Sequence, residues 1–321
     1  MKKIAGLLLA ATMMMGALLG GCSQTSSVGA ATPSNDSADT EEAAAPESAD
    51  APAEETTAPA EETAAPEAQG AGAVKTGLAM ITSFGKSKDA TAEAEGQTQA
   101  DITYVAVTVD DNGVIDQCVI DTVQGKVAFD ATGKITTDLT TKSDSKQVLG
   151  DAYGMKAASG IGKEWHEQIE ALQTYAQGKT AEQVSAIETD ETGHPTGADM
   201  VSAATISISN YQKALAKAVA NAQHLGAQKG DTLKLNSTTK VSKSKDASAE
   251  GDGLGQTYAT MIALTLNGED VNTSRVIHSI KANVNFNAQG QITRDLDAEA
   301  KTKIELHDEY GMRPPSVIGT G

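Results

Sequence analysis

Apolar and polar residues alternate strictly in two segments that lie 157 positions apart. Residues 105–109 read Val-Ala-Val-Thr-Val, and residues 262–266 read Ile-Ala-Leu-Thr-Leu. Large apolar residues at every second position are typical of a strand with one buried face. The pattern therefore predicts two equivalent strands, each in its own sheet.

A turn and further strands are expected after the first of these segments. Asp-Asn-Gly at 111–113 is a hairpin signal, and an apolar run follows at 114–123. Short apolar stretches at 127–129 and 135–136, separated by a Gly-containing turn at 131–134, predict a third and a fourth strand.

The periodicity then changes to that of helices. Trp165, Ile169, Leu172 and Ala176 are spaced four, three and four apart, which predicts an amphipathic helix ending near Gly178. Thr-x-x-Gln at 180–183 resembles a capping box, and a last helix is expected from about residue 206. Strands followed by helices, without βαβ alternation, predict an α+β fold with an antiparallel sheet.

The same unit occurs twice. Residues 86–162 and 243–319 align without a gap, and 32 of the 77 positions are identical. We therefore expect tandem domains at 73–223 and 230–321, the second C-terminally incomplete, because the counterparts of Trp165 and the helices after it lie past Gly321. A sheet without its covering helices exposes an apolar face. Two explanations stay open: a sequence that stops within a longer chain, which we prefer, or cover supplied from elsewhere.

The N-terminus has the features of an export signal. Lys2 and Lys3 precede an uncharged run at 4–21, and Leu19-Gly20-Gly21-Cys22 resembles the bacterial lipobox. This predicts a lipoprotein signal peptide at 1–21, a lipidated Cys22 and a location at the extracytoplasmic face of the cell membrane. The alternative is an ordinary cleaved signal with an incidental cysteine.

A tether is expected between this anchor and the folded part. Residues 23–72 contain 11 acidic side chains, no Lys or Arg, and five of the eight prolines. Such a segment buries too little apolar surface to offset the entropy of ordering it. We therefore interpret 22–72 as a lipidated cysteine followed by a disordered acidic tether rich in Thr, Pro, Ala and Glu.

Charge and composition exclude several classes of function. The 25 Lys+Arg against 43 Asp+Glu leave a net charge of −18, which argues against nucleic acid as a partner. The five histidines show no metal-ligand spacing, so no metal is expected. No Walker or dinucleotide fingerprint is present, which argues against direct NADH binding. Cys118 has no expected partner and is predicted to be a buried small apolar residue.

The segment at 199–207, Asp-Met-Val-Ser-Ala-Ala-Thr-Ile-Ser, combines small and polar residues at the predicted start of the last helix. Asp199 and Ser202 are good N-cap residue types, and Ala203 and Ala204 allow a close approach of the backbone. Amide groups at a helix start favour an anion, so a phosphate near Thr205 would be stabilised. The plain alternative is a capped helix with no ligand.

This segment resembles the flavinylation motif of the FMN-binding domain family, Asp-x-x-Ser-Gly-Ala-Thr, known from the sodium-pumping NADH:quinone reductase. The resemblance implies that Thr205 carries FMN through a phosphoester, one per chain, installed outside the cytoplasm by a flavin transferase that uses FAD. It also implies that Asp199 and Ser202 are the polar positions of the motif, and that Ala203 and Ala204 match its Gly-Ala, with Ala203 a departure.

The wider chain resembles flavinylated surface lipoproteins of Gram-positive bacteria (PplA-like), which have a lipobox, an acidic tether and tandem FMN-binding domains. This resemblance is carried by Tyr153-Gly154-Met155, the 161–165 segment and Glu167-Gln168, beside the motif. It implies electron transfer from a membrane NADH and quinone oxidation system to extracellular acceptors such as ferric iron. Tyr153, Met155 and Trp165 are candidates for packing near the flavin ring, and packing in the protein core is their alternative role.

The sequence is consistent with three functions. The preferred one is a membrane-anchored electron-transfer flavoprotein that needs no catalytic residue of its own, because the redox chemistry belongs to the flavin. The second is a flavin-dependent extracellular reductase of an organic acceptor. The third is a surface lipoprotein without redox activity.

Overall fold

The computed structural model describes residues 72–311. The chain divides into two units, Met1–Thr63 and Ala64–Gly321, and all described residues belong to the second. The expected signal peptide at 1–21, Cys22 and the tether up to residue 71 lie outside the described residues. Within the described residues, no helix is both long and apolar enough to cross a membrane.

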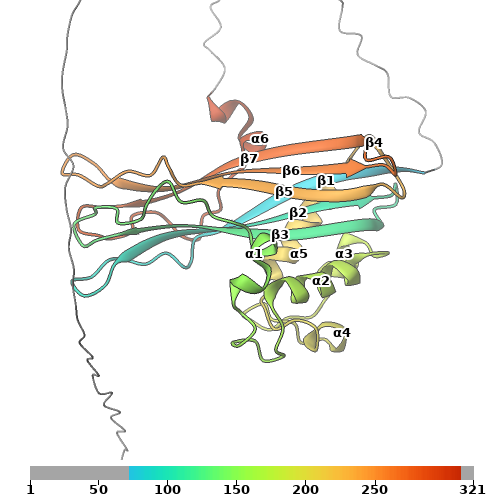
Figure 1. Ribbon diagram of the computed structural model, residues 1–321, viewed down its shortest axis with the longest axis horizontal. Coiled ribbons are helices and arrows are strands. Elements are labelled where there is room, and N and C mark those ends of the chain that lie inside the picture. Colours follow the sequence, from blue (N-terminus) through green and yellow to red (C-terminus); the bar gives the residue numbers. More distant parts are fainter. Residues whose placement is uncertain (1–71, 312–321) are drawn as a thin grey trace, which may run out of the picture. The chain divides into compact units, whose positions relative to one another are not determined.

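Seven strands form two antiparallel sheets (Figure 1). The first sheet has the order β3-β2-β1-β4 and the second the order β5-β6-β7. Their bounds are β1 Ala73–Ser83, β2 Gly96–Val109, β3 Ile115–Phe129, β4 Gln223–Gln228, β5 Thr232–Lys240, β6 Gly253–Leu266 and β7 Asn272–Phe286. The order β7-β6-β5 repeats the order β3-β2-β1, as the internal repeat requires. The α+β class with antiparallel sheets is confirmed.

The hairpin between β2 and β3 is confirmed, and its Gly113 has the positive φ of 77° that such a turn needs. The predicted third and fourth strands are wrong. Residues 127–129 are the end of β3, which pairs with β2 along its length, and Ile135 forms only an isolated bridge with Phe129. The chain leaves the sheet here because the Ile135 backbone N–H is bound by the Asp246 carboxylate of the second repeat, at 2.8 Å.

Helices cover one face of the first sheet (Figure 1). The predicted helix after residue 162 is α2, Trp165–Ala176, and the capping box of Thr180 and Gln183 opens α3, Ala181–Ser185. The last helix is α5, Ser209–Ala220; it begins three residues later than expected, because Ile208 N–H donates to the Gly193 carbonyl at 2.7 Å outside the helix. The shorter elements are α1 Lys146–Leu149, η1 Gly150–Tyr153, α4 Ala198–Val201, α6 Lys303–Leu306 and η2 His307–Tyr310.

Two apolar cores share the first sheet. One lies between this sheet and α2, α3 and α5, and contains Val105, Val107 and Val109; the other lies between the two sheets and contains Ile102 and Tyr104. The strand β2 is therefore buried on both faces, not on one as its alternation predicts. The reason is that the second repeat supplies a cover that a single domain would lack.

In the second repeat the buried face is the opposite one from the prediction. Ala259, Met261 and Ala263 of β6 are fully buried against the first sheet, whereas Ile262 and the other residues of the alternating apolar set are half-buried. The first sheet thus covers one face of the second. The other face of the second sheet corresponds, by the 157-residue shift, to the face of the first sheet that α2 and α5 cover.

The two repeats meet in a reciprocal way. Ala90 N–H donates to the Gly290 carbonyl at 2.7 Å, and Ala247 N–H donates to the Gly133 carbonyl at 2.8 Å. Both pairs are related by the 157-residue shift, and the equivalent rings of Phe129 and Phe286 stack on each other with centroids 4.1 Å apart. The interface therefore has the self-complementary form of a two-fold dimer within one chain.

Candidate functional site

Thr205 lies in the loop between α4 and α5, at the edge of the helical layer. The helix α4 ends at Val201, with Ser202 as its C-cap, and the seven residues 202–208 connect it to α5. Thr205 itself is half-buried, between the buried Ala204 and the half-buried Ile206. The loop is anchored by its buried apolar residues Ala204 and Ile208, and Thr205 lies between them.

A buried glutamine fixes the backbone of this threonine. Gln168 on α2 is completely buried, and its side-chain oxygen accepts a hydrogen bond from Thr205 N–H at 2.7 Å. Its amide nitrogen donates to Ser159 Oγ and to the Lys163 carbonyl, both at 3.1 Å. One side chain therefore connects three segments: α2, the loop before it and the loop that carries Thr205.

The Thr205 hydroxyl has only long contacts. Its oxygen lies 3.4 Å from the Gln168 side-chain oxygen and 3.5 Å from Ser159 Oγ. Both distances are at the limit for an O–H···O hydrogen bond, which is usually about 2.7–2.8 Å. The structure thus holds the main chain of Thr205 firmly and its nucleophilic oxygen weakly.

The neighbouring loop at 154–163 is organised by Glu164, the N-cap of α2. Its carboxylate accepts hydrogen bonds from Met155 N–H at 2.8 Å and Lys156 N–H at 2.9 Å. Burial acts to raise the pKa of Glu164, but these amides and that of Trp165 outweigh it, and the pKa is lowered. The anion that orders the loop therefore persists below the pH at which an ordinary glutamate is protonated.

The other residues of the motif take different positions. Asp199 and Ser202 are exposed, and their side chains make no hydrogen bond to another described residue; Ala203 is half-buried and Ala204 is buried. Neither polar side chain contacts Thr205. The expectation that Thr205 lies at a helix start is wrong, because α5 begins at Ser209 and the Ile208 N-cap has no side-chain cap. The first backbone N–H groups of α5 therefore belong to residues at least four positions after Thr205.

The three residues expected near a flavin ring, Tyr153, Met155 and Trp165, lie in two different environments. Trp165 is 1 % exposed, and its indole N–H donates to the Tyr211 hydroxyl at 3.0 Å, so it packs in the core. Tyr153 and Met155 are half-buried at the edge of that core. The Lys146 ammonium lies over the Tyr153 ring, 4.6 Å from its centre. The ammonium therefore occupies one face of this ring.

Sequence reasoning missed Gln168 and Ser159 as partners of Thr205. A signal for Gln168 was present, because it lies three residues after Trp165 on the apolar face of the predicted helix. A polar side chain on such a face needs hydrogen-bond partners inside the protein. Ser159 has no comparable signal, because a serine in a Gly-rich loop is ordinary.

A groove lies beside the segment that precedes Thr205. A shallow groove of about 470 Å³ runs along α2 beside the motif, lined by small side chains that include Ala171, Thr174 and Ala203. Three carboxylates, Glu167, Glu170 and Asp199, also border it. These carboxylates disfavour a phosphate within the groove, and Thr205 is not among the residues that line it.

Residues 72–311 contain neither a metal-binding cluster nor a reactive thiol. No group of three or more His, Cys, Asp or Glu side chains there is placed to hold a metal ion. Cys118 is a buried free thiol, as expected, and burial raises its pKa to about 12. It is therefore not a reactive thiolate at neutral pH.

Comparisons with known proteins find similarity over about a third of the chain. No family model matches the chain, and no solved structure matches it. A chlorophenol reductase from Desulfitobacterium hafniense is 33 % identical over 119 residues, which is 34 % of this chain and 36 % of the relative. The matched region thus spans about a third of the length of that relative.

Proposed function

We propose that this chain is a membrane-anchored extracytoplasmic flavoprotein that carries FMN on Thr205 and passes electrons from the membrane to extracellular acceptors. The anchor would be a lipid on Cys22. The single observation that carries the proposal is the state of Thr205: its N–H is fixed by the buried Gln168, while its hydroxyl has contacts of only 3.4 and 3.5 Å. A hydroxyl that is positioned but not engaged is suited to become an ester.

The residues of the chain have defined tasks in this proposal. In the attachment step, the Thr205 oxygen forms a bond to the FMN phosphorus of FAD, the pyrophosphate bond breaks, AMP leaves with the electron pair, and the hydroxyl proton passes to the flavin transferase or solvent. Gln168 and Ser159 orient the threonine, and Glu164 orders the adjacent loop. When bound, the flavin supplies the electron-transfer chemistry.

A second function is a flavin-dependent reductase of an organic acceptor. It is favoured by the name of one relative, a chlorophenol reductase, which is similar over about a third of its length. A reductase would need an acceptor site next to the flavin, and the open groove along α2 is the available surface near Thr205.

The attachment is tested by mass spectrometry of the chain exported from a host that has the transferase. We expect one FMN-sized increment on the peptide that contains Thr205. Thr205→Val removes the hydroxyl at nearly constant volume and is expected to abolish the increment, whereas Ser207→Ala two residues away keeps it. An unmodified Thr205 in the wild-type protein would rule out both flavin-dependent functions.

The two flavin functions are separated by reoxidation of the reduced, flavin-loaded protein. An electron-transfer protein is expected to react with ferric chelates and quinones without saturation. A reductase is expected to show saturable turnover with one organic acceptor such as a chlorophenol, and that result would favour the second function.

A further inference from the structure

A lysine of the first repeat is buried without a counter-ion. Lys146, the first residue of α1, is only 8 % exposed. Its ammonium lies 4.6 Å from the centre of the Tyr153 ring and 5.2 Å from that of Trp165. Among residues 72–311 it has no ion-pair or hydrogen-bond partner. Aromatic rings attract a cation but do not neutralise its charge, so no described carboxylate compensates the burial of this ammonium.

The second repeat shows how the equivalent lysine is satisfied. Lys303 takes the place of Lys146 after the 157-residue shift, and its ammonium donates to the Tyr258 hydroxyl at 2.9 Å. The residue equivalent to Tyr258 in the first repeat is Asp101. Its carboxylate is paired with Lys86 at 3.2 Å and accepts two hydrogen bonds from side-chain amides. The acid that could neutralise Lys146 is therefore bound to other residues.

A pocket of about 290 Å³ adjoins this lysine. It lies between the edge strand β3, with Gln124 and Lys126, and the segment 137–146, which runs beside that strand. The Lys146 ammonium is not among the fully enclosed polar atoms that lack a partner in the described residues. It therefore reaches open space, and Lys146 is one of the residues that line the pocket.

The lining of this pocket is suited to an anion. The exposed Lys126 contributes a second ammonium group beside Lys146. Asp144 also lines the pocket, but it is exposed and forms no ion pair with a described residue, so water screens its charge. Hydroxyl groups, which donate as well as accept hydrogen bonds, come from three further residues: Thr137, Thr141 and Ser143. Two ammonium groups against one screened carboxylate favour a ligand with two negative charges.

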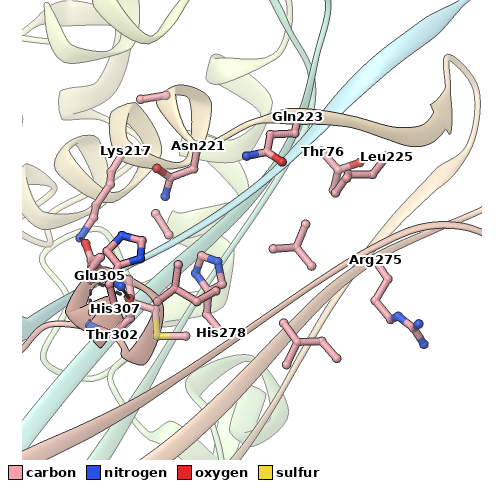
Figure 2. A pocket seen from close by; sticks show the side chains of 16 residues that line it. Thr76, Lys217, Asn221, Gln223, Leu225, Arg275, His278, Thr302, Glu305 and His307 are labelled. Atoms are coloured by element: carbon pink, nitrogen blue, oxygen red, sulfur yellow. Dashed lines mark hydrogen bonds and ion pairs between the residues drawn. The ribbon is translucent and has the colours of Figure 1, made fainter. Parts of the chain in front are cut away.

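The larger cleft between β1 and β7 differs in this respect (Figure 2). Its volume is about 530 Å³. Its Lys217 forms an ion pair with Glu305, toward which it points in Figure 2, and donates to the Met80 carbonyl at 3.3 Å. Its Arg275 is exposed to solvent. Neither the lysine nor the arginine of this cleft is thus both buried and unpaired, and Lys146 distinguishes the smaller pocket.

We propose that the pocket beside Lys146 binds a phosphate group, as the free ion or as the monoester of a small organic molecule. A phosphate monoester carries about two negative charges at pH 7. Lysine ammonium groups bind phosphate as point charges, and hydroxyl groups donate to its oxygens. A carboxylate has one charge and is matched best by a planar guanidinium, which this lining does not contain.

An ester would also use the apolar part of the lining. Leu149 and Val241 lie in the same pocket and offer contacts to a small organic body. Thr205 is not among the residues that line it, so phosphate binding here does not depend on FMN. An unmodified Thr205 would therefore leave this proposal intact.

Calorimetric titration of the full chain tests the ligand class with inorganic phosphate, glycerol 3-phosphate and acetate. The better phosphate probe is expected to bind at least about tenfold more tightly than acetate, which corresponds to about 1.4 kcal/mol. Tighter binding of glycerol 3-phosphate assigns the site to an ester, and tighter binding of inorganic phosphate assigns it to the free ion. Acetate binding as tight as that of both phosphates would overturn the proposal.

Methyl NMR of the leucine- and valine-labelled chain tests the location. The phosphate probe is expected to shift the signals of Leu149 and Val241, which line the pocket. The signals of Val184 and Leu233, in the two apolar cores, are expected to stay unchanged. Shifts at the two core residues without shifts at the pocket residues would contradict the site.

Lys146→Met removes the ammonium group and keeps an unbranched chain. It is expected to weaken phosphate binding at least about tenfold. Without phosphate, its unfolding temperature is expected to equal or exceed that of the wild type, because a buried charge without an ion pair is lost. Phosphate is expected to raise the unfolding temperature of the wild type and not that of the variant.

A second variant avoids the protein interior. Lys126→Gln changes an exposed residue of the pocket and is expected to weaken phosphate binding by about threefold. Lys213→Gln, at an exposed position of α5 outside the pocket, is the control and is expected to leave binding unchanged. Unchanged affinity of Lys146→Met, or an equal loss of affinity in Lys213→Gln, would overturn the proposal.

Discussion

At the scale of single residues, the site depends on groups whose chemistry is set by their partners. Thr205 is a half-buried threonine, and what distinguishes it is the 2.7 Å hydrogen bond from its N–H to the side-chain oxygen of the buried Gln168. Gln168 also satisfies the Lys163 carbonyl and Ser159 Oγ. Loss of this amide would leave the half-buried Thr205 N–H, Lys163 carbonyl and Ser159 hydroxyl without this partner.

We therefore expect Gln168→Leu to lower the free energy of unfolding by about 1–3 kcal/mol, the cost of buried polar groups left unpaired. Urea unfolding monitored by circular dichroism measures this change. Gln177→Leu, the same substitution at an exposed position just after α2, is the control and is expected to change stability by less than about 0.5 kcal/mol. Equal stability of the two variants would contradict the role given to Gln168.

At the scale of elements, the position of the helical layer is set by one close contact. Gly77 of β1 lies under α5, and a Cβ atom built on it would be 2.0 Å from the Ala218 carbonyl oxygen. Backbone atoms of a helix cannot move aside without displacing the whole element. The crossing of α5 over β1 therefore requires glycine at this position, and α5 in turn ends the loop that carries Thr205.

Gly77→Ala is expected to destabilise the protein by about 1–3 kcal/mol, because the added methyl group pushes α5 away from the sheet. Differential scanning calorimetry provides the measurement. Gly85→Ala is the matched control, since a Cβ there meets no atom within 4 Å. An unchanged unfolding temperature of Gly77→Ala would show that the helix does not pack as closely as described.

At the scale of the described unit, the two repeats behave as a dimer joined in one chain. The sequence Lys-Ser-Lys-Asp-Ala stands at 86–90 and again at 243–247. These segments provide Asp89 and Asp246, whose carboxylates accept hydrogen bonds from Ile292 N–H at 2.7 Å and Ile135 N–H at 2.8 Å. The identity of these segments in both copies thus has a structural cause. Each copy must offer the same contact to the other.

A double-mutant cycle tests this interface. Phe129→Leu and Phe286→Leu are each expected to destabilise the protein, and the coupling between them is expected to be about 0.5–1.5 kcal/mol, because the two rings stack on each other. Urea denaturation of the four proteins gives this value. Phe129→Leu combined with Ile187→Val, a residue of the core between the first sheet and the helices to which Phe129 does not belong, is the control and is expected to be additive. Additivity in the Phe pair would contradict direct stacking.

The sequence by itself determined the elements that depend on local chemistry: the hairpin at 111–113, the amphipathic α2, the capping box of α3, the duplication and the α+β class. These follow from spacing and from residue type. Only the tertiary structure decided which face of each strand is buried, because burial depends on what packs there; the second repeat covers Tyr104 and leaves Ile262 half-buried. It alone brought Gln168 and Ser159 to Thr205, since residues distant in the chain become neighbours only when the sheets and helices pack.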